Sequence, residues 1–74
     1  MTVSFKSANA ESKAVMDLAG ISYQETADGI DVQFPESVVI SSDQDEHSQP
    51  SYYEYRVGAE KFVYPLDTET LVVE

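Results

Sequence analysis

The chain has 74 residues, with fourteen Asp and Glu against four Lys and Arg, no cysteine, and a formal charge of −10. This length predicts a single acidic domain, 1–74, near the size at which a core only just offsets chain entropy, with little room for an enclosed active site. The charge disfavours direct binding to nucleic acid or anionic membranes, and the lack of cysteine excludes disulfides and thiolate zinc sites.

Apolar residues make up 42% of the chain and include five Tyr and three Phe, which indicates a folded domain and not a disordered segment. No apolar stretch approaches the roughly 20 residues that span a bilayer, and the first residues do not read as a leader. We therefore expect a cytoplasmic protein, located in the host cytoplasm if a phage encodes it.

The alternation of Val3 and Phe5 predicts a short first strand at 2–6. Residues 10–19 then carry apolar side chains at spacings of three and four, which is typical of an amphipathic helix. The residues expected on its buried face are Ala10, Ala14, Val15, Leu18 and Ala19.

The ends of this helix carry recognisable capping residues. Ser7 or Asn9 is suited to cap its start, and Gly20 stands where a left-handed residue commonly ends a helix. Ile21 follows as the hydrophobic residue that often accompanies such an ending.

Residues 21–34 predict a hairpin, because Asp28-Gly29 lies between two alternating runs as a two-residue turn would. The pairs expected from this turn are Ala27 with Ile30, Glu25 with Val32, and Tyr23 with Phe34. One apolar side then contains Ile21, Tyr23, Ile30, Val32 and Phe34.

After Pro35, residues 38–40 (Val-Val-Ile) show the pattern of a short buried strand. Residues 41–51 contain no apolar side chain, so we expect a flexible, exposed loop. Long loops of this kind often carry function.

A second hairpin is expected from residues 52–57 and 61–64 around Gly58-Ala59-Glu60, and residues 71–73 predict a last strand. The predicted fold class is α+β, with a small antiparallel sheet of five to six short strands and one N-terminal helix packed on one face. The other face of the sheet stays open to water and is the natural place for a binding surface.

Catalysis is not expected. A nucleophile needs a base within hydrogen-bond reach, and the one histidine, His47, lies in the polar loop. The acidic pairs have no cleft that would raise the pKa of one carboxyl group for glycoside chemistry. No cofactor is expected either, since the sequence has no glycine-rich phosphate loop.

The polar loop partly matches a calcium-binding loop, because Asp43, Asp45, His47 and Glu54 stand at its positions one, three, five and twelve. Ser48 replaces the glycine expected at position six, and neither flank reads as a helix. We therefore favour a solvated loop over a metal site and keep an ion-binding module as a third alternative.

Three tyrosines cluster after the loop. Strand alternation places Tyr53 and Tyr55 on one face, which we assign to the core, and Tyr52 on the other. Tyr52, and also Tyr64, are thus candidates for an exposed aromatic anchor in an interface.

The acidic residues themselves are the main functional signal. Alternate residues of a strand lie about 6.6 Å apart, close to the distance between phosphates two rises of about 3.4 Å apart on a nucleic-acid strand. A sheet can therefore present carboxylates at the spacing of phosphates on a nucleic-acid strand. The candidate partner-binding residues, with Tyr52 as the anchor, are Glu25, Asp28, Asp31, Asp43, Asp45, Glu46, Glu54, Glu60, Asp67 and Glu69.

In size, charge, lack of cysteine and helix-plus-sheet outline, the chain resembles phage-encoded DNA-mimic inhibitors, including anti-CRISPR proteins and uracil-DNA glycosylase inhibitors. The resemblance implies an inhibitor that binds a basic nucleic-acid site of a host enzyme or effector complex. The alternatives are a small structural or assembly protein that docks through a sheet edge or the helix, and an acidity that only confers solubility. The oligomeric state is left open.

Overall fold

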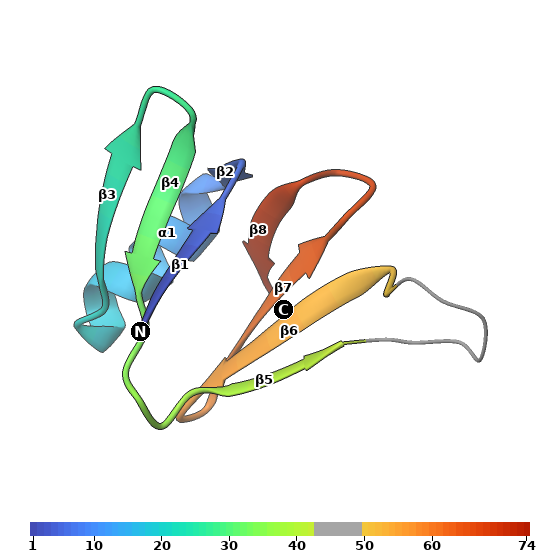
Figure 1. Cartoon of the computed structure of the whole chain (residues 1–74). Coiled ribbons are helices and arrows are strands. Elements are labelled where there is room, and N and C mark those ends of the chain that lie inside the picture. Colours follow the sequence, from blue (N-terminus) through green and yellow to red (C-terminus); the bar gives the residue numbers. More distant parts are fainter. Residues whose placement is uncertain (43–49) are drawn as a thin grey trace.

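A computed structural model describes residues 1–42 and 50–74 (Figure 1). These residues form one helix, α1 (Ala10–Ala19), and eight strands. The strands are β1 (Thr2–Phe5), β2 (Ser7–Ala8), β3 (Ser22–Thr26), β4 (Gly29–Gln33), β5 (Val39–Ser42), β6 (Tyr52–Val57), β7 (Glu60–Pro65) and β8 (Thr70–Val73). The predicted α+β class with a single N-terminal helix is confirmed.

The described strands form two sheets, whereas the sequence predicted one. A three-stranded sheet has the order β1-β4-β3, and a five-stranded sheet has the order β2-β8-β7-β6-β5. The chain bends at Lys6 and passes from β1 in the first sheet to β2 in the second, where β2 pairs with β8 in parallel. All other strand pairs are antiparallel.

The predicted bounds and caps of α1 are confirmed. Asn9 caps the start, because its Oδ1 accepts the backbone N–H of Ser12 at 2.8 Å. Gly20 ends the helix at φ 75°, and the N–H of Ile21 donates to the carbonyl of Met16 at 2.8 Å. In the described part of the chain, no helix is long and apolar enough to cross a membrane.

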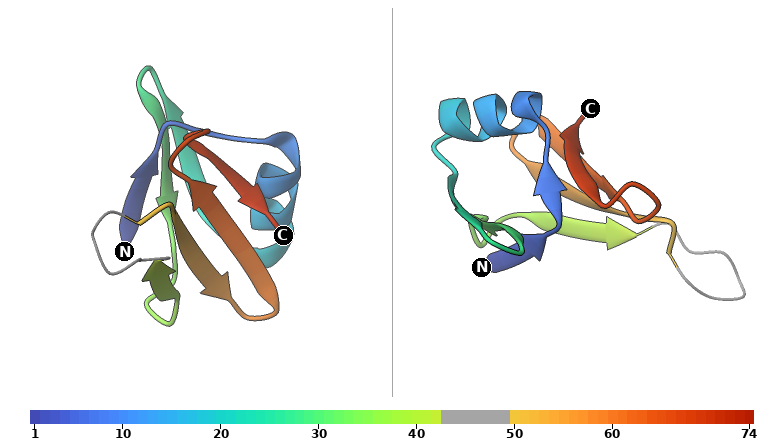
Figure 2. Two further views of the ribbon diagram at one scale, coloured as in Figure 1. Left: turned by 90° about the vertical axis from the view of Figure 1, so that its right-hand side faces the viewer. Right: turned by 90° about the horizontal axis from the view of Figure 1, so that it is seen from above.

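The predicted buried face of α1 is wrong. Ser12 and Met16 are the fully buried helical residues, whereas Leu18 is 89% exposed. Ala10, Ala14 and Ala19 are exposed as well, and Val15 is half-buried. Because α1 packs beside β8 and β3, the residues one turn apart at 12 and 16 face the protein. Figure 2 shows α1 along one side of the molecule, next to β8.

The register of the first hairpin also differs from the prediction. Thr26 pairs with Gly29 and Tyr23 with Val32, so the two turn residues are Ala27 and Asp28. Gly29 lies within β4 at φ 156°, and a Cβ there would stand 2.1 Å from the carbonyl oxygen of Phe5. Only glycine allows β1 to approach β4 this closely. Position 29 is therefore a paired residue of β4 and not a residue of the turn. The shift of two residues leaves the apolar side unchanged.

The core lies between the two sheets, under α1, and five of the ten residues of its buried cluster are aromatic. Phe34 stacks on Tyr55 with ring centroids 5.0 Å apart, and Phe5 meets Tyr55 edge-on at 5.3 Å. These contacts join β1 and the residue after β4 to β6 of the other sheet. The buried cluster contains Phe5, Met16, Ile21, Ile30, Val32, Phe34, Tyr55, Phe62, Tyr64 and Leu71.

The buried strand expected at residues 38–40 is instead the exposed edge strand β5. Val39 is 57% exposed and Ile40 is 47% exposed. In the described sheet, β5 pairs with β6 on one side and with no strand on the other. Its side chains are therefore less covered than those of a central strand. Of the loop expected at 41–51, residues 41 and 42 belong to β5, and residues 43–49 lie outside the described residues.

The second predicted hairpin is confirmed, with Gly58 and Ala59 as the turn and Glu60 already in β7. Tyr55 is buried and Tyr53 is packed against the core, as expected. Tyr64 is not an exposed anchor, because it is 9% exposed and its hydroxyl oxygen accepts the N–H of Lys6 at 3.3 Å.

Candidate functional site

The acidic residues predicted to bind a partner occupy three kinds of position. Outside the described residues lie Asp43, Asp45 and Glu46. Four strands, β3, β4, β6 and β7, carry one acidic residue each, namely Glu25, Asp31, Glu54 and Glu60. The described turns carry Asp28, Asp67 and Glu69. No described strand presents carboxylates at alternate positions, so a phosphate-like row would have to run across strands and turns.

Glu54 is the least accessible of the described carboxylates, at 8% exposure on the outer side of the five-stranded sheet. Its Oε2 lies 2.7 Å from Arg56 Nε, and its Oε1 lies 3.1 Å from Lys61 Nζ. Hydrogen bonds from these two cations hold the pKa of Glu54 below its ordinary value, and Glu54 in turn raises the pKa of Lys61. Its charge is therefore compensated within the sheet.

Glu25 is compensated as well, although it is exposed. Its Oε1 forms an ion pair with Lys13 on α1, and this hydrogen bond raises the pKa of Lys13. Lys61 also reaches Glu74 at 3.7 Å. Three of the four cations of the chain are thus engaged by carboxylates that include Glu25 and Glu54.

The exposed residues Asp28, Asp67 and Glu69 lie on two turns that flank the β1–β2 link, and this part of the molecule is here called the acidic end. The pairing of Phe5 with Ile30, and of residue 7 with residue 70, brings turns 27–28 and 66–69 to the two sides of the β1–β2 link. Figure 1 shows the β3–β4 turn at the top left and the β7–β8 turn lower and to the right. Lys6 lies between them, in the bend of that link.

Asp31 and Glu60 stand apart from this group. Asp31 lies on β4, and one of its carboxylate oxygens accepts the hydroxyl proton of Ser4 at 2.7 Å. Glu60 is half-buried at the start of β7, opposite Val57 at the second hairpin turn. Both are therefore less available to a partner than the residues of the acidic end.

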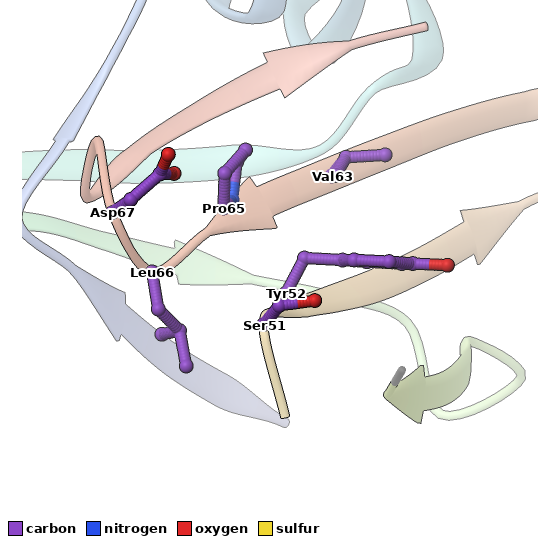
Figure 3. Close-up of a pocket in the computed structure, with 6 residues that line it drawn as sticks. All are labelled: Ser51, Tyr52, Val63, Pro65, Leu66 and Asp67. Carbon is purple, nitrogen blue, oxygen red and sulfur yellow. The ribbon is translucent and has the colours of Figure 1, made fainter. Parts of the chain in front are cut away.

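Tyr52, the predicted aromatic anchor, lines a shallow pocket of about 420 Å³ on the outer side of the five-stranded sheet. The other lining residues are Ser51, Val63, Pro65, Leu66 and Asp67. The walls are mainly apolar because Tyr52 pairs with Pro65 across the ladder and Val63 lies two residues back on the same face. Figure 3 shows Asp67 and Leu66 towards one end of the pocket and the Tyr52 ring towards the other.

Backbone hydrogen bonds fix the turn that carries Asp67. The N–H of Leu66 donates to the carbonyl of residue 51 at 3.0 Å, and the N–H of Glu69 donates to the carbonyl of Pro65 at 2.8 Å. Glu69 adopts a left-handed conformation at φ 54°, which closes the turn. The fold therefore fixes the backbone of Asp67 at the rim of the pocket.

Among the described residues no group of three or more His, Cys, Asp or Glu side chains is placed to hold a metal ion. Asp43, Asp45 and His47 of the calcium-loop alternative lie outside the described residues, and Glu54 is engaged by Arg56 and Lys61. Because His47 is also the residue a nucleophilic site would need, the absence of catalysis stays a prediction.

The sequence interpretation found Tyr52 and Asp67 but missed Val63, Pro65 and Leu66, which complete the pocket. A register count was the available signal: outward from a two-residue turn at 58–59, Tyr52 falls opposite Pro65. Comparison of the chain with protein-family models, with curated proteins and with solved structures returned no match.

Proposed function

We propose that this chain is a non-catalytic binding protein of the phage-type DNA-mimic class, which includes anti-CRISPR inhibitors. Its acidic end would occupy a basic nucleic-acid-binding site of a host enzyme or effector complex. The supporting observation is the distribution of charge: among the described residues, Asp28, Asp67 and Glu69 are exposed and belong to no ion pair.

The physical basis is electrostatic competition. A groove lined by Lys and Arg attracts carboxylates as it attracts phosphates, and complementary charge speeds association and makes it sensitive to salt. With Lys13, Arg56 and Lys61 engaged by Glu25, Glu54 and Glu74, the net charge of −10 is the sum of the other eleven acids and Lys6. Occupation of the groove would exclude DNA or RNA without any chemical step.

The first test is capture from a bacterial lysate on the immobilised chain at low salt. Bound proteins are then eluted either with salt or with a short DNA or RNA duplex. The proposal expects a nucleic-acid-handling enzyme that the duplex displaces and whose activity is inhibited by the chain and regained on release. Retention in the presence of excess duplex would contradict a shared binding site.

Two double variants with the same loss of charge make this test specific. Asp28→Asn with Glu69→Gln removes charge from the acidic end, and Asp17→Asn with Glu36→Gln removes it from exposed positions elsewhere. The first variant should bind the captured enzyme at least about tenfold more weakly, and the second should bind nearly as the unchanged chain does. Equal loss in both variants would mean that only net charge matters.

The alternative function is that of a structural or assembly protein, and one observation favours it. Edge strand β5 exposes Val39 and Ile40, and an exposed edge accepts a further strand from another chain. Binding of that kind is mainly apolar and main-chain, so a captured partner would resist salt and would not be displaced by duplex DNA or RNA.

A further inference from the structure

We infer that the pocket beside Tyr52 is a subsite for one arginine side chain of a basic protein partner. This inference rests on the proposed function and adds to it the contact that provides specificity. Exposed carboxylates steer a partner but discriminate poorly between basic surfaces, whereas a shaped pocket at the edge of an interface selects one side chain.

The walls of the pocket suit the aliphatic stem of arginine. Tyr52, Val63, Pro65 and Leu66 present apolar surface. Val63 is 8% exposed, so the floor is closed from below. A pocket of about 420 Å³ that is open on one side is large enough for a long side chain to lie along it.

The rim of the pocket suits the guanidinium group. Asp67 is the one carboxylate among the lining residues, and Figure 3 shows it at the end opposite the Tyr52 ring. A guanidinium donates paired N–H groups to a carboxylate, while its flat faces and its stem tolerate apolar and aromatic contact. Lysine is the weaker fit, because its compact ammonium is more strongly hydrated.

The pocket is also preorganised. Residues 51 and 66 are joined by a backbone hydrogen bond of 3.0 Å, and the carbonyl of Pro65 accepts the N–H of Glu69 at 2.8 Å and the hydroxyl of Thr68 at 3.3 Å. The turn that carries Asp67 is therefore ordered before any ligand arrives, which lowers the entropy cost of binding. A carboxylate on an ordered turn beside apolar walls, in a chain of charge −10, gives charge complementarity to arginine and to no neutral side chain.

The test is an NMR titration of the isolated, isotopically labelled chain with N-acetyl-arginine methylamide. Citrulline, lysine and norleucine derivatives serve as matched probes, and citrulline has the shape of arginine without the charge. Amide signals of residues 51, 52 and 66–68 should move with arginine, and its dissociation constant should be about threefold to tenfold lower than that of citrulline. The same signals should respond more weakly to lysine.

Variants complete the design. Asp67→Asn should reduce the affinity for arginine to that for citrulline, whereas Asp17→Asn, which removes the same charge from α1 outside the pocket and the acidic end, should leave it unchanged. Tyr52→Leu should weaken both probes if its spectrum shows an intact fold. Equal affinity for arginine and citrulline, shifts that avoid the pocket, or an Asp67→Asn variant that binds normally would each overturn the inference. Asp67 belongs both to the pocket and to the acidic end, so the proposed function is tested separately by the variants at positions 28 and 69, which lie outside the pocket lining.

Discussion

At the scale of single residues, Glu54 shows how this chain places a charge within a sheet. The carboxylate is largely covered, yet each of its oxygens faces a cation, Arg56 at 2.7 Å and Lys61 at 3.1 Å. A covered charge is tolerated when it is paired, and removing one partner leaves the others uncompensated. The three side chains therefore act as a unit on β6 and β7.

This arrangement predicts a pH-dependent effect of Glu54→Gln. Because Arg56 and Lys61 hold the pKa of Glu54 below its ordinary value of 4.5, ionised Glu54 stabilises the fold above that value. This stabilisation is lost as the pH falls through the folded-state pKa. Glu54→Gln should lower the urea midpoint at neutral pH, and its difference from the unchanged chain should shrink as the pH falls below 4.5.

The exposed Glu36→Gln substitution is the control, since it removes a carboxylate that belongs to no ion pair among the described residues. Its urea midpoint should stay near that of the unchanged chain or rise slightly, because it removes like-charge repulsion. A loss of stability in Glu54→Gln that stays the same as the pH falls would show that Glu54 contributes by packing and not by charge.

At the scale of elements, α1 is attached to the five-stranded sheet through Ser12. Its hydroxyl lies 2.8 Å from the carbonyl oxygen of Leu71 in β8 and 2.6 Å from Asn9 Oδ1, and its single proton is donated to either. Ser12 is fully buried, so this contact is closed to water. The helix cap and the helix–sheet contact therefore share one side chain.

Ser12→Ala should destabilise the domain by about 1–3 kcal/mol, because it removes a buried donor from two acceptors. The matched control is Ser22→Ala in β3, where the serine is exposed and the expected change is within about 0.5 kcal/mol. Urea unfolding of both variants measures the difference. A change below about 0.5 kcal/mol for Ser12→Ala would mean that the hydroxyl only fills space.

Ser12 also shows why the bounds of α1 were easier to predict than its packing. Asn9 and Gly20 act through neighbours along the chain, so the bounds of α1 could be predicted from local sequence. The orientation of α1 depends on Leu71, 59 residues after Ser12, and no local pattern indicates it. The prediction that Leu18 is buried was wrong: a leucine in an amphipathic helix usually lies on the buried face, but Leu18 is exposed.

The hairpins also show that local sequence predicts elements better than contacts between distant residues. The alternation in 21–34 was enough to predict two strands, but the register depended on the approach of Phe5 to Gly29, a contact between distant residues. Of the candidate site, Tyr52 and the acids of the turns could be predicted from residue type and alternation. The walls formed by Pro65 and Leu66 required the register of β6 with β7 and the fold of turn 66–69.

At the scale of the whole molecule, the excess of negative charge works against compactness. Carboxylates that belong to no ion pair repel one another across a small domain whose Cα radius of gyration is 12.0 Å. Screening by salt shortens the reach of this repulsion to about 10 Å at 0.1 M. Stability should therefore depend on ionic strength in the direction opposite to binding.

We expect the melting temperature at neutral pH to rise when sodium chloride is added from low salt to about 0.1 M. A gain of about 1 kcal/mol corresponds to about 4–8 °C for a domain of this size. Scanning calorimetry measures it, and the Asp17→Asn, Glu36→Gln double variant should start from a higher melting temperature and gain less. A melting temperature that falls with added salt would show that the ion pairs of Glu25 and Glu54 outweigh the repulsion.

The parallel pair of β2 and β8 has a consequence for how the protein is made. Residues 7 and 8 pair with residues 70 and 71, so β2 stays without its neighbour until the segment containing β8 has left the ribosome. The β3–β4 hairpin and the β6–β7 hairpin involve only nearby residues and can form earlier. The two hairpins can therefore form before the five-stranded sheet is complete, and α1 gains its contacts with β8 only once residues 70–73 have left the ribosome.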